Sequence, residues 1–124
     1  MEQKIENIQI LADSAFEAEN YELAYNYYNR LLEQDLENSE NWLKKGYCAA
    51  NLSKFDRMLD KEVLMSIKTA KNLSSFDEEK TTKIANEIST IIFDKIVESA
   101  KYIQSEIDNE FNAINILPGT LHGV

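Results

Sequence analysis

The chain has 124 residues, of which 44% are hydrophobic and 28% are charged, a composition typical of one globular domain. Its 22 acidic residues outnumber the 13 Lys and Arg residues, which gives a formal net charge of −9. A phosphate backbone or an anionic membrane surface would be repelled by this charge, so we expect no nucleic-acid partner and no membrane partner. A basic peptide or a basic protein surface would be attracted.

The N-terminus has no apolar signal-peptide core, and no apolar run is long enough to span a membrane. Cys48 is the single cysteine, so it cannot form an internal disulfide. These features favour a reducing, cytoplasmic location. Only three glycines and one proline occur, so we expect helices almost throughout.

Apolar residues at helical spacing predict a first helix over about residues 2–19, in which Ala12 and Ala15 allow a close helix contact. Asn20 is expected to form the turn before a second helix over about residues 22–34. The second helix is expected to bury Leu23, Ala24, Tyr27, Tyr28, Leu31 and Leu32. Tyr25 points away from that set and is expected to be exposed.

Residues 35–38 are predicted to form a turn, and Ser39 is a suitable N-cap for the third helix. Gly46 would allow another helix to approach this one closely. Residues 51–55 are expected to form the next turn, which is followed by a fourth helix over about residues 56–72.

Ser75 and Glu78 have the Ser-x-x-Glu spacing of a capping box, which predicts the start of a fifth helix. Apolar residues then recur in steps of four and three from Ile84 to Ile114. An unbroken helix to about residue 112 would be about 50 Å long. Two hairpins offer less surface than that, so we expect the uncovered part of its apolar stripe to form a homodimer contact.

Part of the chain repeats with a period of about 34 residues. Ile8, Leu11, Ala12, Ala15, Tyr21 and Ala24 recur as Trp42, Lys45, Gly46, Ala49, Phe55 and Met58. Trp42-x-x-Lys45-Gly46 and Ala24-x-x-x-Tyr28 resemble the Trp-x-x-Leu-Gly and Ala-x-x-x-Phe patterns of the tetratricopeptide repeat family. The resemblance covers about residues 5–58. Lys45 replaces the family's leucine, Leu36 its proline and Glu62 its large aromatic residue.

The resemblance implies an all-α fold, a right-handed stack of antiparallel helical hairpins followed by a long C-terminal helix. Residues 1–73 would form the tetratricopeptide-like hairpins, and residues 74–114 a capping or dimerising helix. Residues 115–124, with the turn-forming Pro118 and Gly119, would be a tail that suits a linker to a further domain. Residues 56–102 could alternatively be a decayed third hairpin.

The family binds extended peptides in a concave groove lined by the first helix of each repeat. Carried over to this sequence, the partner-binding residues would be Glu6, Gln9, Asp13, Phe16, Glu17, Glu40, Leu43, Lys44, Tyr47, Ala50 and Asn51. Members that grip a C-terminal carboxylate use a Lys and an Asn where this chain has Gln9 and Asp13, so that clamp is absent. An acidic groove with aromatic residues on its floor would suit a basic or amphipathic peptide or helix. The fifth helix could instead fill this groove.

The sequence has no motif that indicates a catalytic, metal or cofactor site. Cys48 lies on the packing face and is expected to be buried, and no His stands near it in the sequence to activate it. No Cys or His spacing suits a metal, and no phosphate-binding glycine loop occurs, so we expect no cofactor, no metal site and no enzyme activity. We therefore predict a non-enzymatic scaffold for protein–protein interaction. The alternatives are a structural dimerisation module built on the long helix, or the N-terminal adaptor domain of a larger protein.

Overall fold

The computed structural model describes the backbone of residues 2–115 and the side chains of residues 4–113. This part of the chain forms five α-helices: α1 (Glu2–Glu17), α2 (Tyr21–Gln34), α3 (Ser39–Leu52), α4 (Asp60–Lys71) and α5 (Glu78–Asn115). It contains no strand, only one isolated bridge between Lys54 and Arg57. The predicted all-α fold with a long C-terminal helix is confirmed. The predictions for the tail after residue 115 lie outside the described residues.

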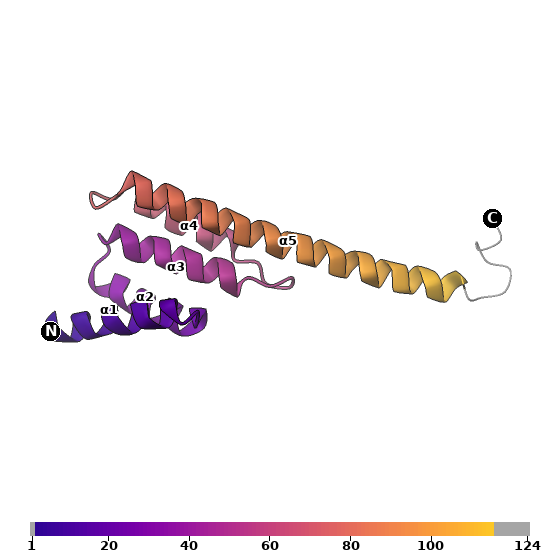
Figure 1. The fold of residues 1–124 in the computed structure, drawn as a ribbon, viewed down its shortest axis with the longest axis horizontal. Helices are drawn as coiled ribbons and strands as arrows, with labels where there is room; N and C mark the ends of the chain where they lie inside the picture. The colour runs from indigo at the N-terminus through magenta and orange to yellow at the C-terminus, as the bar shows by residue number, and fades with distance from the viewer. Residues whose placement is uncertain (1, 116–124) are drawn as a thin grey trace.

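The helices alternate in direction along the chain (Figure 1). Contacts join α1 to α2, α2 to α3, and α3 to α4, while α5 lies along α3 and α4. Figure 1 shows α3 between α1 and α5, and Ile88 of α5 packs with Ala50 of α3, one of the predicted groove residues. The second part of α5 continues well beyond the ends of the other four helices.

Small residues bring α1 and α2 together, as the sequence predicted. Ala12 and Ala24 are completely buried beside Tyr28 in a cluster that also contains Cys48 of α3. Alanine removes the bulk that would hold two helix backbones apart, so the large Tyr28 ring can fill the remaining space. Leu23 was expected in this core but is exposed, because it lies on the outer side of α2.

Gly46 lies at a close approach of α3 to α4. A Cβ atom at this position would lie 3.1 Å from the Cβ atom of Ser66 and 3.8 Å from the Cδ1 atom of Ile88. Ser66 itself is buried. The predicted role of Gly46 in a close helix contact is confirmed. The missing side chain at this position also leaves room for Ile88 of α5.

Lys45 explains one departure from the repeat pattern. Its ammonium lies 5.0 Å from the ring centre of Trp42 and 5.8 Å from that of Tyr25. The side chain is half-buried, so its aliphatic stem can pack where a leucine is usual while its charge faces two aromatic rings. Tyr25 is half-buried rather than exposed as predicted, since it also donates a hydrogen bond to the Glu62 carboxylate.

Two predicted capping residues were misplaced by one or two positions, although α3 does begin at Ser39. Asn38, and not Ser39, caps α3: its side chain accepts from the Asn41 backbone N–H at 3.0 Å. The Ser39 hydroxyl instead donates to the Ala70 carbonyl at 3.1 Å, at the end of α4. Likewise Asp77 accepts from the backbone N–H of residue 80 at 3.1 Å and caps α5 in place of Ser75.

Ser75 ties the start of α5 to the start of α3. Its hydroxyl accepts from the Ser39 backbone N–H at 2.9 Å and donates to the Glu37 carbonyl at 2.6 Å. At the other end of the bundle α4 begins at Asp60, four residues later than predicted. Residues before it form the Lys54–Arg57 bridge, and the Leu59 backbone N–H donates to the buried Ser53 hydroxyl at 3.1 Å.

Candidate interaction surfaces

Two surfaces are candidates for binding a partner: the predicted groove between α1 and α3, and the long exposed part of α5. In the groove, Asp13 of α1 is the centre of a polar network. Its carboxylate accepts from the Tyr28 hydroxyl at 2.6 Å, from the Lys44 ammonium at 3.2 Å and from the Gln9 amide at 3.2 Å. These bonds join α1 to both α2 and α3.

A second pair of bonds closes this network. The Gln9 and Asn41 side-chain amides bond to each other in both directions, at 3.0 and 3.1 Å, and Asn41 is buried. Three residues that were predicted to bind a partner, Gln9, Asp13 and Lys44, thus lie close together. They are already hydrogen-bonded within the chain. Their geometry indicates that they hold α1 against α3.

The charge of Asp13 is stabilised by its neighbours. Partial burial alone would raise the pKa of this carboxyl group, but the Tyr28 hydroxyl, the Lys44 ammonium and the Gln9 amide together hold it below its ordinary value. Conversely, burial and the adjacent carboxylate raise the pKa of Tyr28. Asp13 is therefore ionised and acts as an acceptor near neutral pH.

Aromatic side chains of α1, α2 and α3 lie together beside this network. The rings of Phe16 and Tyr47 lie 5.1 Å apart between their centres, and Tyr21 lies 5.8 Å from Tyr47. The Lys44 ammonium lies 5.5 Å from the centre of the Phe16 ring. All three rings are half-buried and pack against one another, so little of their area is free for a partner.

The remaining predicted groove residues are divided. Leu43 and Ala50 are buried and have no surface to offer, and the Asn51 amide donates to the Tyr47 carbonyl at 3.0 Å. Glu6, Glu17 and Glu40 are exposed, although Glu40 also pairs with Lys44 at 3.5 Å.

Ile10 is exposed in a shallow hollow beside Asp13 and Glu17. It was not among the predicted partner-binding residues. An isoleucine outside the helical spacing of the buried set was the signal for it.

The first part of α5 is anchored in the bundle. Ile88 is almost completely buried in a cluster with Ala49 and Ala50 of α3 and Val63 of α4. Ile84, Ile91 and Ile92 are half-buried against the same cluster. This part of the apolar series is a structural core.

No other described part of the chain covers the second part of α5 in this way. Every residue from Ala100 to Ala113 is exposed. Large apolar side chains continue along it with exposed fractions of 54% for Tyr102, 43% for Ile103, 55% for Ile107 and 49% for Phe111. From outside α5, Phe55 reaches this region, with its ring centre 5.4 Å from that of Tyr102.

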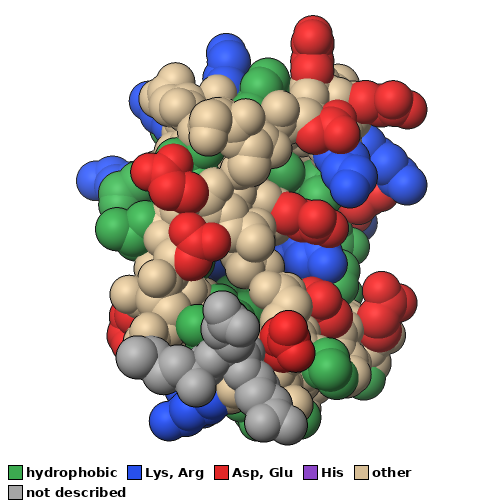
Figure 2. Space-filling model, turned by 90° about the vertical axis from the view of Figure 1, so that its left-hand side faces the viewer, with side chains coloured by type: hydrophobic (Ala, Val, Ile, Leu, Met, Phe, Trp, Pro, Cys, Tyr) green, Lys and Arg blue, Asp and Glu red, His purple; other side chains and the backbone are tan. Residues whose placement is uncertain are grey.

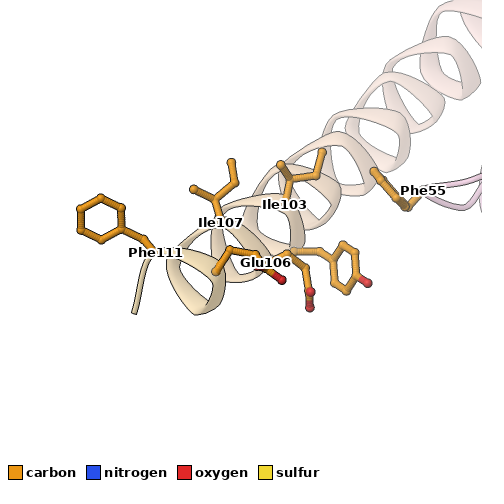
Figure 3. A pocket seen from close by; sticks show the side chains of 7 residues that line it. Phe55, Ile103, Glu106, Ile107 and Phe111 are labelled. Carbon is orange, nitrogen blue, oxygen red and sulfur yellow. The ribbon is translucent and has the colours of Figure 1, made fainter. Parts of the chain in front are cut away.

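These residues form a surface hollow, which we call the distal hollow. It is lined by Phe55, Tyr102, Ile103, Glu106, Ile107, Glu110 and Phe111. Figure 3 shows Ile103 and Ile107 projecting from the same side of the helix, with Phe111 beyond them and Phe55 at the other end.

The apolar series shifts gradually around α5. At 3.6 residues per turn, Ile103 and Ile107 are rotated by about 100° from Ile84 and Ile88, and the half-buried Ile92 lies between the two pairs. Phe93 and Ile96 are exposed even where α5 still contacts the bundle. The described part of the chain therefore covers only the first part of this continuous series.

The charged residues that line the distal hollow are both acidic, Glu106 and Glu110, whereas Lys54 and Lys95 lie in a neighbouring hollow at its Phe55 end. Between residues 102 and 113 the chain has Glu106, Asp108 and Glu110 but no Lys or Arg. The ion pairs found among the described side chains join Lys44 to Asp13 and Glu40, and Lys80 to Glu40, so none involves these three acids. The opposite end of the molecule differs, because Lys and Arg side chains lie among Asp and Glu side chains there (Figure 2).

Cys48 is buried as predicted, and burial raises the pKa of its thiol to about 12. A thiol held in the protonated form is a poor nucleophile. Among residues 2–115, no three His, Cys, Asp or Glu side chains are grouped so that they could hold a metal ion. In the same range no helix combines the length and apolarity that crossing a membrane requires. His122 lies outside the described residues.

Comparison with protein-family models, with curated proteins and with solved structures finds no match to this chain. The resemblance to tetratricopeptide repeats therefore stays a prediction.

Proposed function

We propose that this chain is a non-enzymatic protein-interaction module in which the helical hairpins hold α5 and present its distal half to a partner helix. The observation that supports this proposal is the exposed apolar series Tyr102, Ile103, Ile107 and Phe111, together with Phe55. Their spacing along α5 matches the way one amphipathic helix packs on another.

The anchoring of α5 favours such a role. Its first half is fixed by Ile88 and the residues around it, so the distal half is already helical before a partner arrives. A partner then gains the burial of four large side chains without the cost of ordering this segment. Solvent-exposed apolar surface of this kind is typical of interaction sites in soluble proteins.

A panel of synthetic helical peptides tests the proposal. The first peptide carries Leu at positions i, i+3, i+4 and i+7 and neutral Gln elsewhere, and its binding to the full chain is measured by fluorescence anisotropy. We expect binding that the double substitution Ile103→Ser/Ile107→Ser abolishes. The control Leu64→Ser/Met65→Ser, on exposed apolar residues of α4, should leave it unchanged. Equal loss in both variants would show that the distal half of α5 is not the docking surface.

The groove between α1 and α3 is a second candidate surface, as the resemblance to tetratricopeptide repeats implies. On α1, the exposed Ile10 lies in a shallow hollow with Asp13 and Glu17, and an apolar spot flanked by acids suits a basic or amphipathic peptide. Phe16 and Tyr47 pack against each other, so their removal would also disturb the fold. Ile10→Ser with Glu17→Lys is the cleaner test. If this variant alone lost binding of the same peptides, the groove would be the working surface.

A further inference from the structure

We infer that the partner of the distal hollow is an amphipathic helix whose apolar face is bordered by Lys or Arg, and not a second copy of this chain. The inference rests on the proposed function, since it names the kind of helix that the surface accepts. It is drawn from the position of the charges relative to the apolar side chains.

The hollow combines an apolar wall with a carboxylate edge. Phe55, Ile103 and Ile107 contribute to the wall, while Glu106 and Glu110 belong to the same lining. These two glutamates are four residues apart, so they lie one above the other on one side of α5. Figure 3 shows Glu106 directly beside Ile103 and Ile107.

A Lys or Arg side chain matches this arrangement. Its aliphatic stem can lie on the apolar wall while its cationic head reaches a carboxylate at the edge. The exposed rings of Phe55 and Tyr102 add aromatic faces that attract a cation. A neutral amphipathic helix would satisfy the wall but leave the carboxylates without a partner.

A second copy of this chain has the wrong charge. In a parallel pair, Glu106, Asp108 and Glu110 would face their own counterparts, and like charges across a helix contact are unfavourable. In an antiparallel pair that buries the same apolar residues, they would again face residues 102–111, which include no Lys or Arg. Neither arrangement supplies a net positive charge, and two chains of net charge −9 also repel each other at long range.

Two further peptides with the same Leu face test the inference, one bordered by Lys and one bordered by Glu. We expect the Lys peptide to bind the full chain about tenfold more tightly than the Gln peptide, and the Glu peptide to bind more weakly than both. High salt should reduce these differences, because exposed charges are screened.

Charge reversal locates the effect. Glu106→Lys/Glu110→Lys should reverse the preference, so that the Glu peptide binds more tightly than the Lys peptide. The control Glu33→Lys/Glu87→Lys changes the net charge by the same amount at exposed positions elsewhere and should keep the preference for Lys. A reversal in both variants would show that only net charge matters, which would overturn the inference.

The remaining outcomes separate this inference from the proposed function. Equal binding of the three peptides, with loss in the Ile103→Ser/Ile107→Ser variant, would refute the basic partner and leave the docking surface intact. No binding of any peptide would refute both. Light scattering on the full chain provides the last test: a dimer that Ile103→Ser/Ile107→Ser converts to monomer would identify a second copy as the occupant and overturn the inference.

Discussion

The two halves of α5 have similar apolar side chains but opposite environments. The first half contacts α3 and α4 through Ile84, Ile88, Ile91 and Ile92. The second half exposes Ile103, Ile107 and Phe111 to solvent. The difference arises from length. α3 has 14 residues and α4 has 12, which corresponds to about 20 Å each, while the 38 residues of α5 extend for about 57 Å. A helix of this length cannot be covered by its neighbours, so the same pattern produces a core in one half and a surface in the other.

Shortening one isoleucine in each half of α5 tests whether the two halves differ in burial. Ile88→Ala removes a buried side chain and should lower the free energy of unfolding by about 3 kcal/mol, from lost burial and the cavity left behind. Ile107→Ala removes an exposed side chain and should change it by no more than about 0.5 kcal/mol. Urea unfolding followed by circular dichroism measures both.

Equal destabilisation by the two substitutions would mean that the distal half of α5 is covered in solution. A measurement at several protein concentrations would then separate self-association from a contact within one chain, because only the former depends on concentration.

A substitution at Asp13 tests whether its hydrogen-bond network stabilises the fold. Asp13→Asn removes the charged acceptor of Tyr28 and Lys44, and should lower the free energy of unfolding by about 1–2 kcal/mol at pH 7. The pKa of Asp13 is lower in the folded chain than its ordinary value of 3.8, so its ionised form stabilises the fold. This contribution is complete above about pH 5 and is lost as the pH falls through the folded pKa.

Urea unfolding of the original chain and of the Asp13→Asn variant between pH 7 and pH 3 measures this dependence. The difference in stability should decrease as the pH falls below about 4. Asp94→Asn, at an exposed carboxylate for which the structure shows no hydrogen bond or ion pair, is a suitable control. A difference that stays constant down to pH 3 would show that the Asp13 network does not depend on charge.

Most of the helices, but not their surroundings, were predictable from the sequence. The period of the apolar residues and the positions of Gly46, Ala12 and Ala15 indicated which side of each helix packs. Those features depend on local geometry. The capping residues were misplaced because Asn38 and Ser39, or Ser75 and Asp77, are equally good caps locally. Long-range hydrogen bonds of Ser39 to Ala70 and of Ser75 to Ser39 decide between them.

The candidate site was less predictable than the fold. The sequence placed Leu43 in the groove, where the structure buries it, because a single helix pattern does not tell which neighbour lies on which side. The length of the apolar series in α5 did predict an uncovered stripe. The contribution of Phe55 to it could not be predicted, since this residue comes from a turn 47 positions before Tyr102.

Gly46 offers a smaller effect at the point where α3, α4 and α5 meet. Gly46→Ala would place a Cβ atom 3.1 Å from the Cβ atom of Ser66, a contact between two backbone-fixed atoms that only a helix shift can relieve. Overpacking costs about 1–3 kcal/mol, and the better helix propensity of alanine returns about 1 kcal/mol. We therefore expect a net loss of about 1 kcal/mol in urea unfolding. A gain in stability would show that α3 and α4 can separate freely at this point.

The smallest effect is expected from removing the distal half of α5. A chain that ends after Tyr102 keeps Ile88 and every buried residue of the bundle, and it also keeps the contact between Tyr102 and Phe55. Its free energy of unfolding should stay within about 0.5 kcal/mol of that of the full chain, because the described side chains that are removed, those of residues 103–113, are exposed. The same chain should lose all binding to the Lys-bordered peptide, since Ile103, Glu106 and Ile107 are gone. A substantial loss of stability would instead assign the distal half of α5 to the fold, and its apolar residues would then need no partner to explain them.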